Sequence, residues 1–165
     1  MGGKKIHPEI QLLLRLLDEA YEKQAWHGPN LRGSLRGLTF RDAAPRPAPG
    51  RHNIWELTVH AAYWKYVVRR RLTGEKRGSF PLKGSNWFER PIQSTSQAWK
   101  KDLKLLDEQH RMLRVVIEKL PPERLYQQSA GSSQPNIAIV QGIAAHDFYH
   151  AGQIQLIKRL TRTRR

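Results

Sequence analysis

Two histidines four residues apart, His146 and His150, are the residues of this sequence best suited to chemistry. On a helix, residues at this spacing lie on one face with about 6 Å between their Cβ atoms, so both imidazoles can reach one cation. The same face carries apolar residues before and after the pair, which directs both histidines into the protein. The pair therefore predicts a divalent-metal site, and two core histidines with ordinary hydrogen-bond partners are the simpler alternative.

The residues around the pair exclude a zincin-type metalloprotease. In a zincin helix the residue after the first histidine is a glutamate that acts as general base, and here it is Asp147. A zincin also needs a ligand downstream, but no His, Asp or Glu follows His150. Because the chain contains no cysteine, imidazole and oxygen are the ligands left for a transition metal. A third ligand must then come from upstream.

His60 is the best upstream candidate for this third ligand. It shares an expected apolar helix face with Leu57, Ala61, Trp64 and Val68. It can meet the other two histidines only if the two helices are neighbours. Three inward-facing imidazoles would leave coordination positions for water or substrate, as in catalytic rather than structural sites.

Four further side chains are expected around this metal or in its pocket. Gln153 lies on the stripe of His150 and could orient a bound nucleophile or a ligating imidazole. Tyr63 and Trp64 could wall the pocket, or could simply be core aromatics. His110 could be a fourth ligand, a second-shell group or a core histidine with ordinary partners, and we favour the last. The histidines at 7, 27 and 52 are expected at the surface, and His52 is also a candidate for the rim of the pocket.

Apolar residues repeat at steps of three and four in several segments and predict an all-α protein, a four-helix bundle. The expected helices span about 8–26, 53–73, 94–120 and 136–161, within one domain covering residues 1–165. Asn53 with Glu56 predicts a capped start for the second helix, and Gly74 predicts its end. The long connections, 75–93 and 121–135, are expected to pack on the bundle or at a dimer interface through Trp87, Phe88, Leu125 and Tyr126.

Charge is the unusual global property, with 29 Lys and Arg against 14 acids and a formal net charge of +15. Such a field favours encounter with anions and indicates nothing about the fold. The excess is concentrated at 31–51, 60–84 and 158–165. No segment is long and apolar enough to be a membrane span, so a cytoplasmic location is expected by exclusion.

Two segments together resemble the DinB-like (YfiT-type) family. They are Ile54-Trp-Glu-Leu-Thr-Val-His60-Ala-Ala-Tyr-Trp64 and Ala145-His146-Asp-Phe-Tyr-His150-Ala-Gly-Gln153-Ile154. The resemblance implies a bundle of up-down-down-up topology and frequent homodimers. It also implies that His60, His146 and His150 hold Ni²⁺, Zn²⁺ or a similar ion. Relatives include thiol-dependent S-transferases and proteins described as metal-dependent hydrolases.

An enzyme acting at an open triple-histidine metal site is therefore the favoured hypothesis, either a thiol-dependent transferase or a hydrolase. Its substrate would be small and, given the charge, anionic. Any nucleophilic thiol must come from a low-molecular-weight thiol cofactor, since the chain has no cysteine. One alternative is a non-enzymatic stress-response or nucleic-acid-binding module that uses the basic surface, although no helix-turn-helix, RNA-binding or zinc-finger motif supports it. Another is a family member whose site keeps only a structural role.

Overall fold

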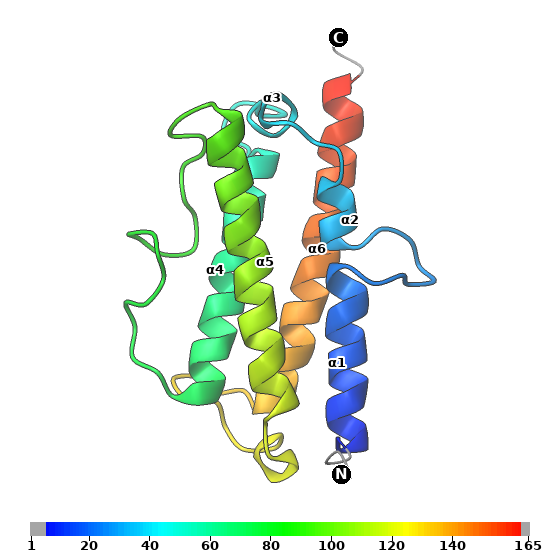
Figure 1. Ribbon diagram of the computed structural model, residues 1–165, viewed down its shortest axis with the longest axis vertical. Helices are drawn as coiled ribbons and strands as arrows, with labels where there is room; N and C mark the ends of the chain where they lie inside the picture. The colour runs from blue at the N-terminus through cyan, green and yellow to red at the C-terminus, as the bar shows by residue number, and fades with distance from the viewer. Residues whose placement is uncertain (1–5, 163–165) are drawn as a thin grey trace.

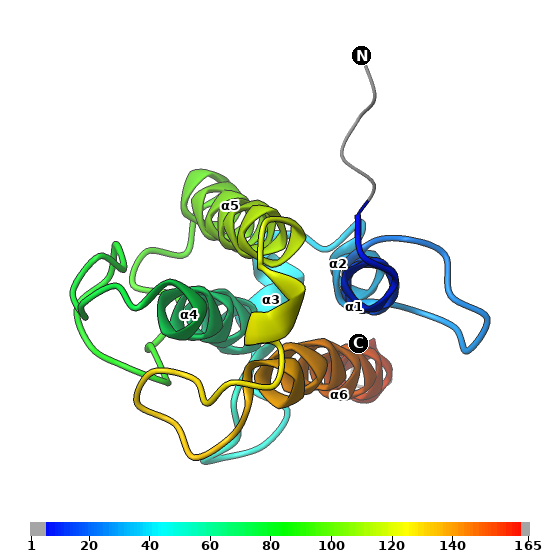
Figure 2. The same cartoon turned by 90° about the horizontal axis from the view of Figure 1, so that it is seen from below.

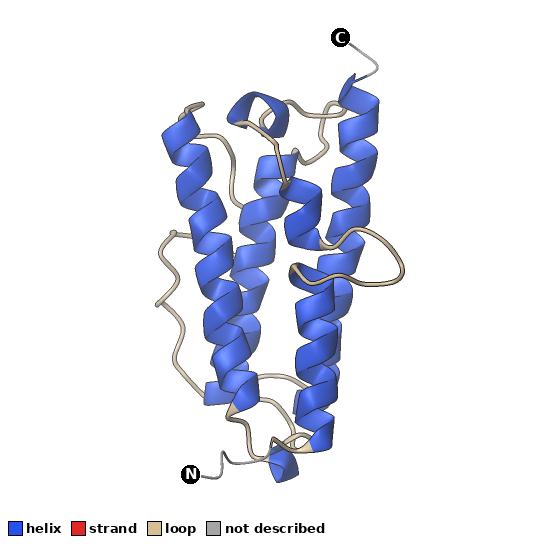
Figure 3. Cartoon of the chain, turned by 45° about the vertical axis from the view of Figure 1, so that its right-hand side comes forward, coloured by secondary structure: helices blue, strands red, loops and turns tan. Residues whose placement is uncertain are grey.

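The computed structural model describes residues 6–162, which form helices joined by loops. Figure 3 shows no strand in this part of the chain. The all-α bundle predicted from the hydrophobic periodicity is confirmed. Its elements are α1 (Pro8–Tyr21), α2 (Leu31–Leu35), α3 (Phe40–Ala43), α4 (Ile54–Thr73), α5 (Ser96–Glu118), the short 3-10 helix η1 (Pro122–Arg124) and α6 (Asn136–Arg162).

The four long helices stand at the corners of a square when the bundle is seen from below (Figure 2). Helix α4 packs against α5 and α6, and α1 packs against the same two helices. Following the colours of Figure 1, α1 and α6 run upward whereas α4 and α5 run downward. Since α4 and α5 are parallel neighbours, the connection between them must travel back along the bundle. Residues 74–95 do so on the outside of the bundle (Figure 1).

Helix α4 begins and ends with the signals found in the sequence. The Asn53 side chain accepts a hydrogen bond from the Glu56 N–H at 2.8 Å, and the Glu56 carboxylate accepts one from the Asn53 N–H at 3.2 Å. Gly74 closes the helix with a left-handed φ of 76°. Glu56 thus serves the helix start, as expected.

Helix α1 ends at Tyr21, not near Trp26 as the sequence indicated. The backbone leaves helical geometry at Glu22, where φ is −141°. The Asn30 amide then donates to the Lys23 carbonyl at 2.7 Å, and this holds the chain in a loop. Trp26 lies on that loop and is 98% exposed, so its apolar side chain does not extend the helix face.

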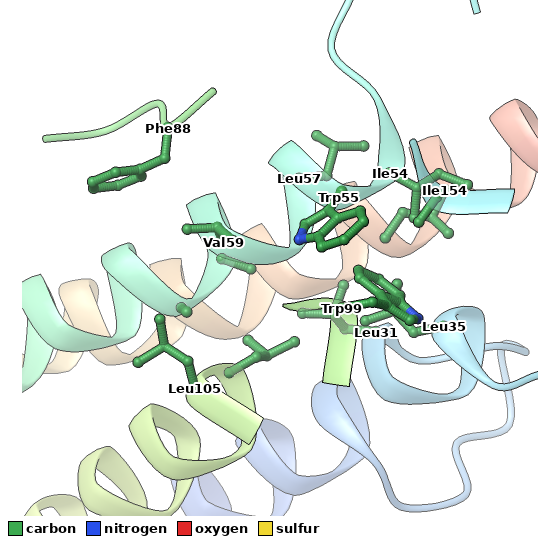
Figure 4. Close-up of a cluster of buried hydrophobic side chains, with 14 of the residues drawn as sticks. Leu31, Leu35, Ile54, Trp55, Leu57, Val59, Phe88, Trp99, Leu105 and Ile154 are labelled. Carbon is green, nitrogen blue, oxygen red and sulfur yellow. The ribbon is translucent and has the colours of Figure 1, made fainter. Parts of the chain in front are cut away.

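Two tryptophans near the starts of α4 and α5 join these helices in the core (Figure 4). The rings of Trp55 and Trp99 meet edge to face with centroids 5.1 Å apart. Both indole N–H groups are satisfied, Trp55 by Asp102 at 2.7 Å and Trp99 by the Leu38 carbonyl at 2.9 Å. Burying each ring contributes roughly 1.5–3 kcal/mol to stability. These contacts hold the parallel helices α4 and α5 together.

A buried polar layer on α6 lies between the helix residues of two hydrophobic core clusters. Its centre is the ion pair between Lys65 of α4 and Asp147 of α6, whose side chains are both 0% exposed. Burial lowers the pKa of Lys65 and raises that of Asp147 to about 6, while each charge favours ionisation of the other. The sequence placed Lys65 in a basic stretch, but the structure places it in the core.

The long connections pack on the bundle only in part as expected. Phe88 and Leu125 are buried. Tyr126, expected as an apolar anchor, is 65% exposed, and its hydroxyl donates instead to Glu9.

In the region described here, none of the helices has the length and apolarity needed to cross a membrane.

Asp147→Asn should lower the free energy of unfolding by about 3–5 kcal/mol, because it leaves the Lys65 ammonium buried without its counter-charge. The double variant Lys65→Met/Asp147→Leu should recover most of this loss, since apolar side chains can replace a buried pair. Urea denaturation of metal-free protein measures both effects. Equal destabilisation of the single and double variants would contradict this account.

Candidate metal centre

Three histidines from α4 and α6 meet in the middle of the bundle. The Nε2 atom of His146 lies 3.2 Å from that of His60 and 3.0 Å from that of His150. Their ligand atoms all lie within 4.8 Å of one another. His60 and His150 are buried and His146 is partly buried. The three residues that the sequence selected are therefore brought together.

Hydrogen bonds fix which nitrogen of two rings carries the proton. His60 Nδ1 lies 2.8 Å from the Asn86 backbone carbonyl, which can only accept, so Nδ1 is the donor. His150 Nδ1 lies 2.7 Å from Gln153 Oε1, while the Gln153 amide nitrogen donates to the Tyr149 hydroxyl. In the neutral rings both Nε2 atoms are then unprotonated and present a lone pair.

The His146 imidazole cannot satisfy both of these lone pairs. One N–H on its Nε2 points to one neighbour only, and its Nδ1 is buried with no hydrogen-bond partner in the described chain. A cation would accept all three nitrogens at once. Two ligands held at about 2.0–2.1 Å from one ion, about 90–110° apart, are themselves about 2.8–3.4 Å apart. The two Nε2 distances from His146 match that separation.

Burial keeps the three imidazoles neutral near pH 7. It lowers the pKa of His60 to about 4 and that of His146 to about 3, and it lowers the pKa of His150 as well. Repulsion between the rings adds to the effect at His60 and His146. Neutral imidazole is the form that binds metal, so the electrostatics suit coordination.

Trp87 covers one side of the site, although nothing in its sequence spacing indicated this. Its indole stacks on His60 with centroids 3.8 Å apart and on His52 with centroids 3.6 Å apart. It is therefore held between two imidazoles, and 37% of the residue remains exposed. The sequence suggested only that Trp87 anchors a connection.

Asn86 is the other residue that the sequence did not reveal. Its backbone has a left-handed φ of 65°, a conformation that asparagine tolerates better than most residues. Its carbonyl accepts from His60, and its side-chain oxygen accepts from the Trp64 indole at 2.9 Å. One residue of the 74–95 connection therefore orients both a candidate ligand and a neighbouring aromatic.

The remaining expected residues are distributed unevenly around the site. Gln153 contacts His150, and the Trp64 ring lies 6.2 Å from that of His146 and 6.4 Å from that of His60, centroid to centroid. Tyr63 instead packs against Phe80, with ring centroids 5.3 Å apart. Tyr63 thus belongs to an aromatic cluster beside the three histidines.

His110 lies in the core and not with the three histidines. Its ring stacks on Tyr21 at 3.7 Å, and neither ring nitrogen has a hydrogen-bond partner among the described residues. It is therefore a core histidine, as favoured, but one without the ordinary partners that we expected. Asp147 and Glu56 are engaged with Lys65 and with the α4 start, and the triple-histidine group contains no carboxylate within residues 6–162.

A family model of the DinB superfamily matches residues 24–154. The matched span contains His60, His146 and His150, and it agrees with the resemblance found in the sequence. Comparison with curated proteins gave no match, and comparison with solved structures gave none either.

The buried histidines should make metal-free protein acid-sensitive. Burial lowers the pKa of His110 to about 2. Below about pH 6.5 each such histidine binds a proton in the unfolded chain but not in the folded chain. The free energy of unfolding is therefore highest above that pH and falls by about 1.4 kcal/mol per pH unit for each of these histidines. His110→Leu removes one of them and should reduce the slope by about 1.4 kcal/mol per pH unit between about pH 6.5 and 4. Urea denaturation across this range tests it, and unchanged slopes would refute it.

Proposed function

The chain belongs to the DinB superfamily, and we propose that it is a metal-dependent enzyme whose ion is held by His60, His146 and His150. The observation that carries this proposal is the convergence of three imidazole Nε2 atoms. In two of these rings, His60 and His150, the Nδ1 atom donates a hydrogen bond to an acceptor. Both of these rings turn an Nε2 lone pair toward His146 Nε2, which lies 3.0 Å from that of His150 and 3.2 Å from that of His60 and can donate to only one of them. A bound cation would accept all three nitrogens.

When bound, Ni²⁺ or Zn²⁺ supplies Lewis acidity at this position. The protein contributes three nitrogen ligands, fewer than the four that Zn²⁺ takes or the six that Ni²⁺ often takes. Gln153 and the Asn86 carbonyl hold two imidazoles in the tautomer that ligates. Trp87 shields one face of His60 from water. These residues build a site in which a substrate group can complete the coordination shell.

The reaction that we propose is transfer to a small thiol or hydrolysis. The chain has no cysteine to act as nucleophile, and the histidine cluster has no carboxylate to act as general base. A thiol nucleophile would therefore come from a low-molecular-weight cofactor. The direct test measures the metal content of protein purified without chelating resin. It then compares hydrolysis with conjugation to bacillithiol, mycothiol and glutathione, and a metal-loaded protein inert in every assay would speak against an enzyme.

His146→Ala and His150→Ala should each abolish metal retention, because two imidazoles from different helices hold an ion far more weakly than three. Gln153→Leu should weaken metal binding by roughly 10–100-fold, since it frees the His150 ring to rotate. His7→Ala and His27→Ala are controls, because neither histidine belongs to the cluster. Elemental analysis after dialysis reports the result, and equal metal content in all five variants would remove the basis of the proposal.

A homodimer is also part of this proposal, supported by an exposed apolar stripe on α6. Tyr149, Leu156 and Leu160 are 64%, 58% and 49% exposed, and they share one side of the helix. Exposed apolar patches of this kind mark interaction surfaces.

Leu156→Lys should convert the dimer to monomer, because it places a charge within the stripe. Met112→Lys is a matched control on α5, where Met112 is 45% exposed. Size-exclusion chromatography with light scattering measures the mass of each variant. A monomeric parent protein, or a dimer that survives Leu156→Lys, would count against this interface.

A further inference from the structure

A basic cavity of about 740 Å³ lies beside the histidine cluster, between the C-terminal half of α4 and residues 77–86. We propose that it binds an organic anion with at least two negative charges. That this anion is the substrate rests on the proposed function, whereas its binding in the cavity does not.

Charge is the first observation that supports an anion. Four cationic side chains line the cavity and no acidic residue does; the four are Arg70, Arg71, Arg77 and Lys83. The nearby carboxylate of Glu75 is not part of the lining and is held by the guanidinium of Arg69 at 2.7 and 2.8 Å. The cations of the cavity are thus left without a balancing carboxylate in its walls.

Arg71 gives the second, independent observation. Its Nε atom is buried and has no hydrogen-bond partner within residues 6–162. A buried donor left without an acceptor costs about 1–3 kcal/mol. Arg71 also lines the cavity, so a rotation of its side chain toward a ligand carboxylate or phosphate would give this donor an acceptor in a charge-assisted hydrogen bond.

Aromatic residues also line the cavity, which indicates a ligand with an apolar body. Phe80 lies 5.3 Å from both Tyr63 and Tyr66, centroid to centroid. The Tyr66 hydroxyl accepts a hydrogen bond from the Gly78 N–H at 3.1 Å, so the connection is fastened to α4 at this point. Ring faces beside guanidinium groups suit a molecule that carries acidic groups on an apolar or planar frame.

The cavity adjoins the histidine site, because Asn86 lines it and accepts hydrogen bonds from both His60 and Trp64, which is itself part of the lining. His60, Trp64 and Arg71 lie on one side of α4, and the helical rise puts Arg71 about 16 Å along the axis from His60. A ligand held at Arg71 would have to be extended to reach His60 as well, whereas a compact anion would bind in the cavity alone.

The test uses isothermal titration of full-length, metal-free protein with trimesate, phenyl phosphate and uncharged benzamide. Trimesate or phenyl phosphate should bind saturably at one site, and benzamide should not. The stronger of the two anions tells whether the cavity prefers carboxylate or phosphate. The triple variant Arg70→Gln/Arg71→Gln/Arg77→Gln should weaken binding by about tenfold or more.

The matched control Lys100→Gln/Arg111→Gln/Lys119→Gln removes the same charge from exposed positions on α5 and at its C-terminal end. It should leave the affinity within about twofold, because charges outside the cavity act only through the screened field. Arg71→Gln alone, checked by thermal unfolding, replaces the triple variant if the latter does not fold. Equal losses in the two triple variants, or no saturable binding of either anion, would overturn the proposal.

Metal content separates this proposal from the function proposed above. The cavity variant should retain metal, and metal-free His146→Ala protein should still bind the anion. That pair of results supports the cavity even if no enzymatic activity is found. Anion binding that disappears with His146→Ala would place the anion at the histidines and so refute the cavity site.

Discussion

A lysine and an aspartate can be buried together only when they touch, and in this bundle Lys65 and Asp147 do so between α4 and α6. Sliding either helix by one turn would separate the charges inside an apolar core. Lys65 follows His60 on α4, and Asp147 directly follows His146 on α6. The register that joins the charges therefore also joins the histidine nitrogens. The candidate metal centre depends on this one pairing.

Topology contributes the other half of the site. Because α4 and α5 run in parallel, their connection has to pass along the outside of the bundle (Figure 1). On this path it brings the Asn86 carbonyl to Nδ1 of His60 and the Trp87 indole to the face of the same imidazole. A short turn between antiparallel helices would supply neither residue. The length of the connection is thus a structural requirement that the site uses.

The histidine cluster could be predicted from the sequence because helical periodicity shows which residues share a face. His60, His146 and His150 stand in apolar stripes, and the bundle brings those stripes together. The partners of these residues could not be predicted in the same way. Asn86 and Trp87 lie in a connection that has no periodicity. Lysine is usually a surface residue, and nothing in the sequence identified Asp147 of α6 as the buried partner of Lys65. Tyr126 shows the converse, since an aromatic in a connection can find a surface acceptor and stay exposed.

The left-handed backbone of Asn86 also bears on how such a protein can diverge. The three histidine nitrogens stand on two packed helices, whereas Arg77 and Lys83 stand on the connection. Changes at exposed connection positions can therefore alter the cavity walls without moving the histidines, provided that the turn at Asn86 is kept. The fold thereby places different constraints on two neighbouring regions: packing holds the histidine cluster, and the exposed connection tolerates change.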